Sequence, residues 1–194
     1  MQQVQSGEVS PSVRRRLRNK GSAIAEFAPA LCILICGVML PLLDLGFIPI
    51  RYAVAYVMVN SKINQLALAK SAGNARQALE WDSGWKARLA GCGIQVKKSD
   101  LSIVVTDRSN QQHRFRAGQK GVIPGDLLPN PDPEKPRLVY RLEISTSLEI
   151  SPLFTMRGQG VPGLTSPVPV GITALANWEN LAGDPETGEF YINE

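Results

Sequence analysis

Residues able to perform acid–base, nucleophilic or metal chemistry are few and scattered in this chain. The single histidine, His113, lies in the polar stretch 108–116, which we predict to be a loop. No cysteine or acidic cluster stands at ligand spacing around it, whereas zinc sites use several such ligands. A Ser-His-Asp or Cys-His set needs a histidine that the fold positions. We therefore predict no metal, no cofactor and no enzymatic activity.

Two other patterns point to structure and surface rather than to ligand binding. Asp126, Asp132 and Glu134 lie in a proline-rich segment without the spacing of a calcium loop, and we interpret them as solvated surface. The sequence holds no G-x-x-x-x-G-K phosphate loop. Trp81 and Trp85 stand one helical turn apart, which favours core or interface positions over a ligand platform.

The three cysteines fall into two groups. Cys32 and Cys36 lie in an apolar segment, and Cys92 stands alone downstream. A single thiol cannot form a disulfide within the downstream part of the chain. Cys92 is therefore either a small buried hydrophobe or a residue that pairs with another chain.

Positive charge is concentrated near the N-terminus. Five basic residues precede position 21, namely Arg14, Arg15, Arg16, Arg18 and Lys20. Beyond them, basic and acidic residues are equal in number once the single early acid, Glu8, is also set aside. A nucleic-acid surface needs clustered positive charge on the folded domain, so we predict no nucleic-acid partner.

The basic run is followed by an apolar segment long enough to cross a membrane. Residues 27–43 contain no charged side chain, and as a helix they would extend about 25 Å, or about 35 Å if continued to Ile50. The hydrocarbon core of a bilayer is about 30 Å thick. Positive flanks stay in the cytoplasm, so the chain after Ile50 is expected outside it. A cleaved secretory signal fits less well, because its apolar core is shorter and ends at a small-residue site; a lipoprotein fits less well because neither Cys32 nor Cys36 follows a small residue.

Downstream, the pattern changes from helix to strand. Apolar residues between Val54 and Ala67 recur at helical spacing, and we expect the helix to continue until Gly73-Asn74. A second short helix with Leu79, Asp82 and 85–89 at helical spacing is expected to end at Gly91 and Gly93.

Alternating residues predict three strands, at 101–105, 138–150 and 168–178. The second alternates without a miss, with apolar residues and Thr146 at even positions and polar ones at odd positions, as in an antiparallel sheet with one buried face. Prolines that open the third fit an edge strand or a strand start. The fold class is therefore α+β: a long N-terminal transmembrane helix that continues as an amphipathic helix, then a small antiparallel sheet domain.

The segment Gly21-Ser22-Ala23-Ile24-Ala25-Glu26-Phe27 joins the basic run to the apolar span. It resembles the signal of type IV prepilins, and the longer segment 21–47 looks like the TadE-like pseudopilins (minor pilins) of Tad (Flp) systems. Leu43-Asp44-Leu45-Gly46 matches the end of that pattern, although Phe47 stands where the family often has arginine. The resemblance covers residues 14 to about 60.

The resemblance implies a set of roles for these residues. A prepilin peptidase would cut between Gly21 and Ser22, and the basic residues would hold the leader in the cytoplasm. Glu26, then the fifth residue, would pair with the new amine of a neighbouring pilin or pseudopilin, with Phe27 beside it. An acid is costly in an apolar segment unless it is paired. An unpaired, solvated Glu26 at the headgroup layer is the alternative.

Three functions are left open at this point. The first is a pseudopilin with a cleaved leader at 1–21, an N-terminal helix at 22–72 and a periplasmic α+β domain at 73–194, in a single-pass protein of the bacterial inner membrane or in a pilus. The second is an uncleaved signal anchor that tethers an envelope domain binding a ligand or the cell wall. The third, a tethered periplasmic enzyme, lacks a recognisable catalytic set.

Overall fold

The computed structural model describes residues 26–107, 109–129, 138–154 and 160–194. The chain divides into two compact units, Met1–Asp44 and Leu45–Glu194, which are considered separately below. A long N-terminal apolar helix and a four-stranded antiparallel sheet make the α+β fold that the sequence predicts.

One helix runs over Glu26–Ala67 and is long and apolar enough to cross a membrane, by length and composition. It is α-helical over 26–34, widens into a π-helical turn at Ile35–Met39 (η1) and continues as α2, Leu40–Ala67. Proline lacks an N–H and its ring crowds the carbonyl four residues earlier. Pro41 directly follows the turn in which Leu40 N–H donates to Ile35 O. Gly37 is the residue four positions before Pro41, so its carbonyl receives no hydrogen bond from Pro41 and is crowded by the ring. The wider turn just before Pro41 fits this loss.

The second half of α2 belongs to the core of the second unit. Ala55, Val59, Ile63 and Leu66 are buried, and their spacing of three or four residues places them on one side of the helix. The helix ends at Ala67, so the prediction that it continues to Gly73-Asn74 is wrong. A new helix, α3 (Ala72–Trp81), begins there because Ser71 caps it: Ser71 Oγ accepts a hydrogen bond from Asn74 N–H at 3.2 Å.

The expected second helix is in fact two helices. After α3, the chain turns at Asp82-Ser83 and forms α4, Gly84–Gly91. Trp81 and Trp85 are consequently on different helices: Trp85 is buried, and Trp81 is exposed. Gly93, just after α4, has a φ of 74°, a conformation that favours glycine.

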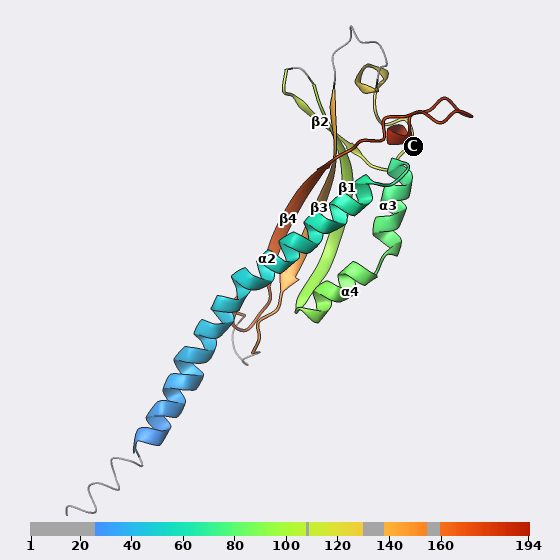
Figure 1. Cartoon of the computed structure of the whole chain (residues 1–194). Coiled ribbons are helices and arrows are strands. Elements are labelled where there is room, and N and C mark those ends of the chain that lie inside the picture. Colours follow the sequence, from blue (N-terminus) through green and yellow to red (C-terminus); the bar gives the residue numbers. More distant parts are fainter. Residues whose placement is uncertain (1–25, 108, 130–137, 155–159) are drawn as a thin grey trace, which may run out of the picture. The chain divides into compact units, whose positions relative to one another are not determined.

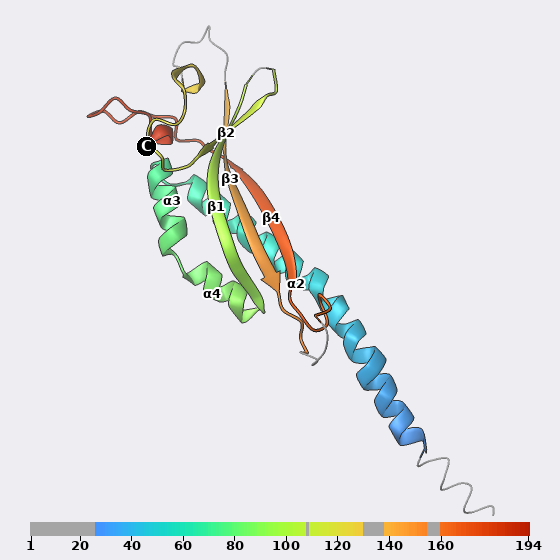
Figure 2. The same ribbon diagram turned by 180° about the vertical axis from the view of Figure 1, so that it is seen from behind.

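The sheet has four antiparallel strands in the order β2-β1-β3-β4. Their bounds are Ile94–Thr106 (β1), Gln112–Arg116 (β2), Val139–Ile150 (β3) and Val168–Asn177 (β4). The helices α2, α3 and α4 lie on one side of the sheet (Figure 1), and the view from behind shows the sheet in front of them (Figure 2). The core thus lies between the sheet and the helices.

The alternation predicted for the strands is confirmed. Tyr140, Leu142, Ile144, Leu148 and Ile150 of β3 are all buried and belong to the core. In β4, Ile172, Ala174 and Ala176 are buried, and the next residue in this alternation, Trp178, is buried as well. Pro169 lies in β4, which is an edge strand, as expected for a proline.

One strand was not predicted. Residues 112–116, expected in a loop, form β2 and pair with the end of β1, with Thr106 opposite Gln112 and Ser102 opposite Arg116. The preceding turn is held by Asp107, whose Oδ1 accepts hydrogen bonds from Ser109 Oγ at 2.7 Å and from Gln111 N–H at 2.9 Å. Two short 3-10 helices, η2 (Gly125–Leu127) and η3 (Tyr191–Asn193), complete the described elements.

Candidate assembly surface of the N-terminal helix

The helix of the first unit exposes apolar side chains on all its sides. Exposed large apolar residues occupy nine of the seventeen positions from Phe27 to Leu43: Phe27, Leu31, Ile33, Leu34, Ile35, Val38, Met39, Leu42 and Leu43. A helix that is apolar all round needs lipid or other apolar helices around it. This part of the chain is therefore a surface for a membrane, for helix packing, or for both.

The predicted site residues fall partly within the described chain. Glu26 is the first described residue; it is helical and exposed, with Phe27 (66% exposed) next to it. Gly21, Ser22 and the basic residues Arg14, Arg15, Arg16, Arg18 and Lys20 lie outside the described residues. Cleavage and pairing thus stay predictions.

The π-helical turn is a feature of this surface that the sequence analysis did not predict. It contains Cys36 and Gly37, and Cys32 lies one turn earlier; both cysteines are exposed and free. Such turns are rare and are often found at functional positions. Pro41 was the available signal, although a proline by itself predicts a kink as well as a π turn. Asp44, the last residue of the first unit, is buried.

In the second unit, two basic residues of α2 hold it to its neighbours. The Arg51 guanidinium donates a hydrogen bond to the carbonyl of Ser151, just after β3, through Nη1. Ser151 N–H in turn donates to Gly93 O at 2.9 Å. A Cβ built at Gly93 would lie 3.0 Å from Arg51 Cζ, so a larger residue would have to displace the guanidinium slightly, while the positive φ of Gly93 favours glycine by conformation.

The second basic residue, Lys62, is buried beside the break between α3 and α4. Its Nζ lies 2.6 Å from Asp82 Oδ2, while Asp82 Oδ1 accepts a hydrogen bond from Gly84 N–H at 2.9 Å. The hydrogen bond from Lys62 and that from Gly84 N–H lower the pKa of the Asp82 carboxyl. Asp82 therefore connects α2 to the start of α4.

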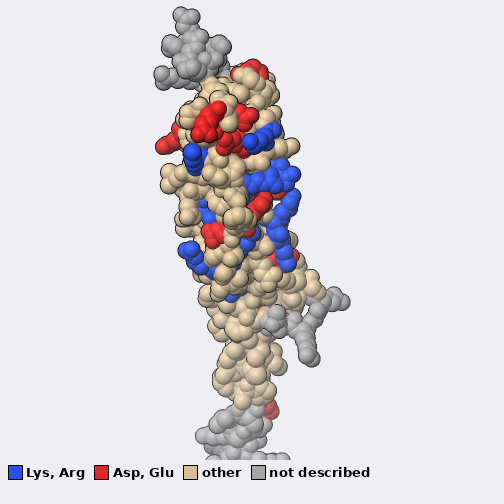
Figure 3. Space-filling model, turned by 90° about the vertical axis from the view of Figure 1, so that its right-hand side faces the viewer, with Lys and Arg blue, Asp and Glu red and all other residues tan. Residues whose placement is uncertain are grey.

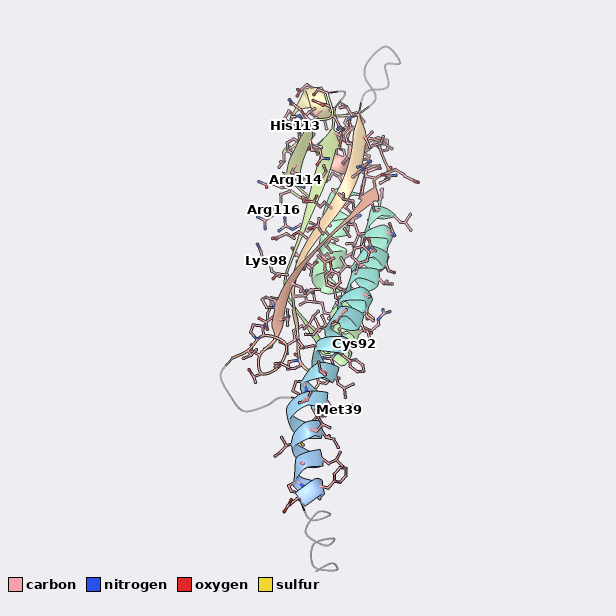
Figure 4. The ribbon with its side chains drawn as sticks, turned by 90° about the vertical axis from the view of Figure 1, so that its left-hand side faces the viewer. Met39, Cys92, Lys98, His113, Arg114 and Arg116 are labelled. Atoms are coloured by element: carbon pink, nitrogen blue, oxygen red, sulfur yellow. The ribbon has the colours of Figure 1, made fainter. Side chains whose placement is uncertain are left out.

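The uncovered face of the sheet carries several cations near one edge. Lys98, Arg114 and Arg116 project from β1 and β2 on the same side (Figure 4). Lys98 Nζ is 2.6 Å from Asp100 Oδ2, and Arg114 Nη2 is 3.1 Å from Oε2 of the buried Glu143. The Lys98 hydrogen bond holds the pKa of Asp100 below its usual value. These pairs were not predicted, because strand pairing brings them together.

His113 lies in β2, beside the acid that holds the β1–β2 turn. Its Nε2 lies 3.7 Å from Asp107 Oδ2 at the β1–β2 turn, and hydrogen bonds from Ser109 and Gln111 lower the pKa of Asp107. Among the described residues, no three histidines, cysteines or acids come together as metal ligands. Burial raises the pKa of Tyr140 to about 12, and its hydroxyl donates to Leu127 O at 3.0 Å.

Cys92 is half-buried, free and packed against the core, which fits the interpretation of a small apolar residue. No family model matches the chain, and neither a curated protein nor a solved structure matches it.

Proposed function

We propose that this chain is a TadE-like pseudopilin (minor pilin), a single-pass protein that takes part in assembly of a Tad-type pilus or a related secretion machine. The observation that carries the proposal is the order of features around one helix. A basic run, then Gly21-Ser22, precedes Glu26 and an apolar segment that the structure shows as a helix. Each feature alone is common, but their order and spacing are those of a prepilin peptidase substrate.

The physical role of each part follows from its chemistry. Glycine before the cut leaves no side chain to obstruct a protease at the membrane surface. Cutting after Gly21 would create an amine at Ser22, four residues before Glu26. An acid and an amine attract more strongly in a low-dielectric helix bundle than in water. Pairing of Glu26 with the amine of a neighbouring subunit would fix the axial register of the two helices.

The proposed location follows from the same charges. The basic residues Arg14 to Lys20 would keep the leader in the cytoplasm, and the second unit would face the periplasm. Partners would be a prepilin peptidase during processing and other pilins or pseudopilins afterwards. The exposed apolar residues between Phe27 and Leu43 supply the surface for that packing.

The processing step is tested by N-terminal sequencing and mass measurement of the protein recovered from membranes of a peptidase-positive cell. We expect the mature chain to begin at Ser22, and Gly21→Ala to leave a precursor about 2 kDa heavier, since about twenty residues of ~110 Da are retained. A wild-type chain that still begins at Met1 would contradict processing and favour the uncleaved signal anchor.

The pairing step is tested separately with Glu26→Ala and a control, Glu8→Ala, in the leader. Glu26→Ala should be cut as efficiently as the wild type but should enter assemblies less, because the amine loses its partner. Glu8→Ala should change neither readout. Unaltered assembly of the Glu26 variant would refute the pairing while leaving the processing result intact.

A further inference from the structure

The second unit separates its charges between two surfaces. The last sixteen residues, 179–194, contain five acids and no lysine or arginine. The acids gather at one end of the domain, and lysines and arginines run along one side of it (Figure 3). Because both surfaces are on one chain, a second copy offers each of them a partner of opposite charge.

The basic surface is a groove at the edge of the sheet where β2 ends. A cavity of about 340 Å³ there is lined by Lys98, Asp100, Leu101, Ser102, Arg114, Phe115 and Arg116. Lys98 and Arg114 have internal acidic partners in Asp100 and Glu143. Arg116 is exposed, and the described chain gives its guanidinium no hydrogen bond or ion pair. The Arg116 charge also acts on Asp100. With Glu143 counted, the groove has three cations and two acids, so it keeps a net positive charge that can bind an acid from outside.

The acidic surface is a tight loop at 183–190, which projects from the domain (Figure 1). Asp184 N–H donates to Glu189 O at 2.7 Å, and Asp184 Oδ1 accepts from Glu186 N–H at 3.1 Å. Glu186 and Glu189 are both exposed. Lys70 lies next to the segment that follows the loop, with its Nζ 5.1 Å from the Tyr191 ring centroid. The internal bonds hold the loop in shape before binding, which reduces the entropy lost on association.

We propose that the acidic loop 183–190 of one copy docks into the basic groove of a second copy, with Glu186 or Glu189 paired to Arg116. The two surfaces are different patches, so the contact is heterologous and each copy keeps a free groove and a free loop. Contacts of this kind propagate into rings or filaments. The inference is independent of cleavage after Gly21 and of the helix packing proposed above.

The test uses the purified full chain in mild detergent with Cys32→Ser, Cys36→Ser and Cys92→Ala. One tagged copy carries Ser102→Cys, which lies in the groove opposite Arg116, and a second, differently tagged copy carries Thr187→Cys, next to Glu186, so that both charges are kept. Oxidation should join the two copies. The matched control replaces the first cysteine with Arg88→Cys, which alters an exposed arginine on α4 in the helical layer. Yield with the control should be lower, because Arg88 lies on α4 and does not line the groove that the loop would enter.

Salt provides a second readout, because the Debye length falls from about 10 Å at 0.1 M to about 3 Å at 1 M. Cross-linking between the groove and the loop should fall with salt, whereas random collision should not. Yields equal to the Arg88 control, or yields independent of salt, would overturn the proposal. So would cross-linking of Thr187→Cys in membranes to a different protein but not to a second copy.

Charge reversal covers the case in which the cysteine background perturbs folding. With native cysteines kept reduced, Arg116→Glu and Glu186→Arg should each lower self-association measured by sedimentation in detergent. Mixing the two variants should restore it, because the opposite pair forms between them. Failure of the mixture to associate, with both variants folded by tryptophan fluorescence, would refute the docking.

Discussion

The buried side of α2 allows a quantitative test of the second unit. Ile63 is fully buried and Val57, on the same helix, is 65% exposed. Ile63→Ala removes three carbon atoms, which at about 0.8 kcal/mol each lose about 2.4 kcal/mol of burial. The cavity left behind adds a further cost, and such substitutions span about 2–5 kcal/mol. We expect the free energy of unfolding to fall by about 3–4 kcal/mol.

Val57→Ala is the matched control within the same helix. It removes two carbons that are mostly in water, a loss of about 0.5 kcal/mol. Alanine also has a better helix propensity than valine by a similar amount. The two effects oppose each other, so we expect a change near zero.

The assay is equilibrium unfolding of the full chain by urea in mild detergent, followed by tryptophan fluorescence. Trp85 and Trp178 are buried and report on loss of the core, whereas Trp81 is exposed. Domain stabilities are about 5–15 kcal/mol, so the Ile63 variant should still fold. Similar destabilisation by the two variants, or less than about 1 kcal/mol for Ile63→Ala, would refute the assignment of this part of α2 to the core.

Two further predictions concern single residues. Gly93→Ala should lower the free energy of unfolding by about 1–3 kcal/mol, because a φ of 74° is strained for alanine and its Cβ would meet the Arg51 guanidinium. The control Gly91→Ala, in open space at the end of α4, should be neutral or slightly stabilising. Equal urea midpoints for the two variants would contradict this prediction. The pKa of Tyr140 is raised to about 12, so the folded state keeps the phenol proton above the usual pKa of 10. The resulting contribution to the free energy of unfolding is complete below pH 10 and is lost as pH rises toward 12. Tyr140→Phe should lose this part of the pH dependence of unfolding, and a pH dependence equal to that of the wild type would count against the prediction.

The sequence predicts best the strands in which every second residue is apolar. In β3, period-two alternation continues over the whole strand, and the structure places it between two partners. Strand β2 has only one apolar residue, Phe115, among five, so hydrophobic alternation could not identify it. It forms because its backbone pairs with the end of β1 and because Asp107 and Asn110 (φ 62°) make the turn. Turn residues were the available signal.

The helix boundaries show a similar limit. Gly73-Asn74 looked like a stop signal, but Asn74 N–H is satisfied by Ser71, so both residues belong to the first turn of α3. The stop lies earlier, at Ala67, where apolar periodicity still continues in sequence. The break between α3 and α4 depends on Asp82, which binds Lys62 twenty positions away. A pattern limited to neighbouring residues does not contain that information.

Sequence alone could predict one of the two candidate surfaces, the apolar helix, but not the other, the groove on the sheet. The apolar helix that follows Glu26 could be predicted from composition, because charge and apolar length are local properties. The groove at Lys98 and Arg116 does not, because these residues are eighteen positions apart and come together only when β2 pairs with β1. Pairing registers between strands are set by the whole sheet rather than by either strand.

The two parts of the long helix differ in a way that bears on where assembly occurs. Between residues 55 and 66 one side of α2 is covered by the core of its own unit, and Lys62 finds Asp82 there. Between 27 and 43 apolar side chains are exposed on every side, and none of them belongs to that core. A helix segment already packed gains little from a new neighbour, whereas an unpacked one gains dispersion contacts along its whole length. Substitutions at exposed positions such as Ile33 should therefore affect association with other helices and leave the unfolding of the second unit unchanged, while those at Ile63 should do the reverse.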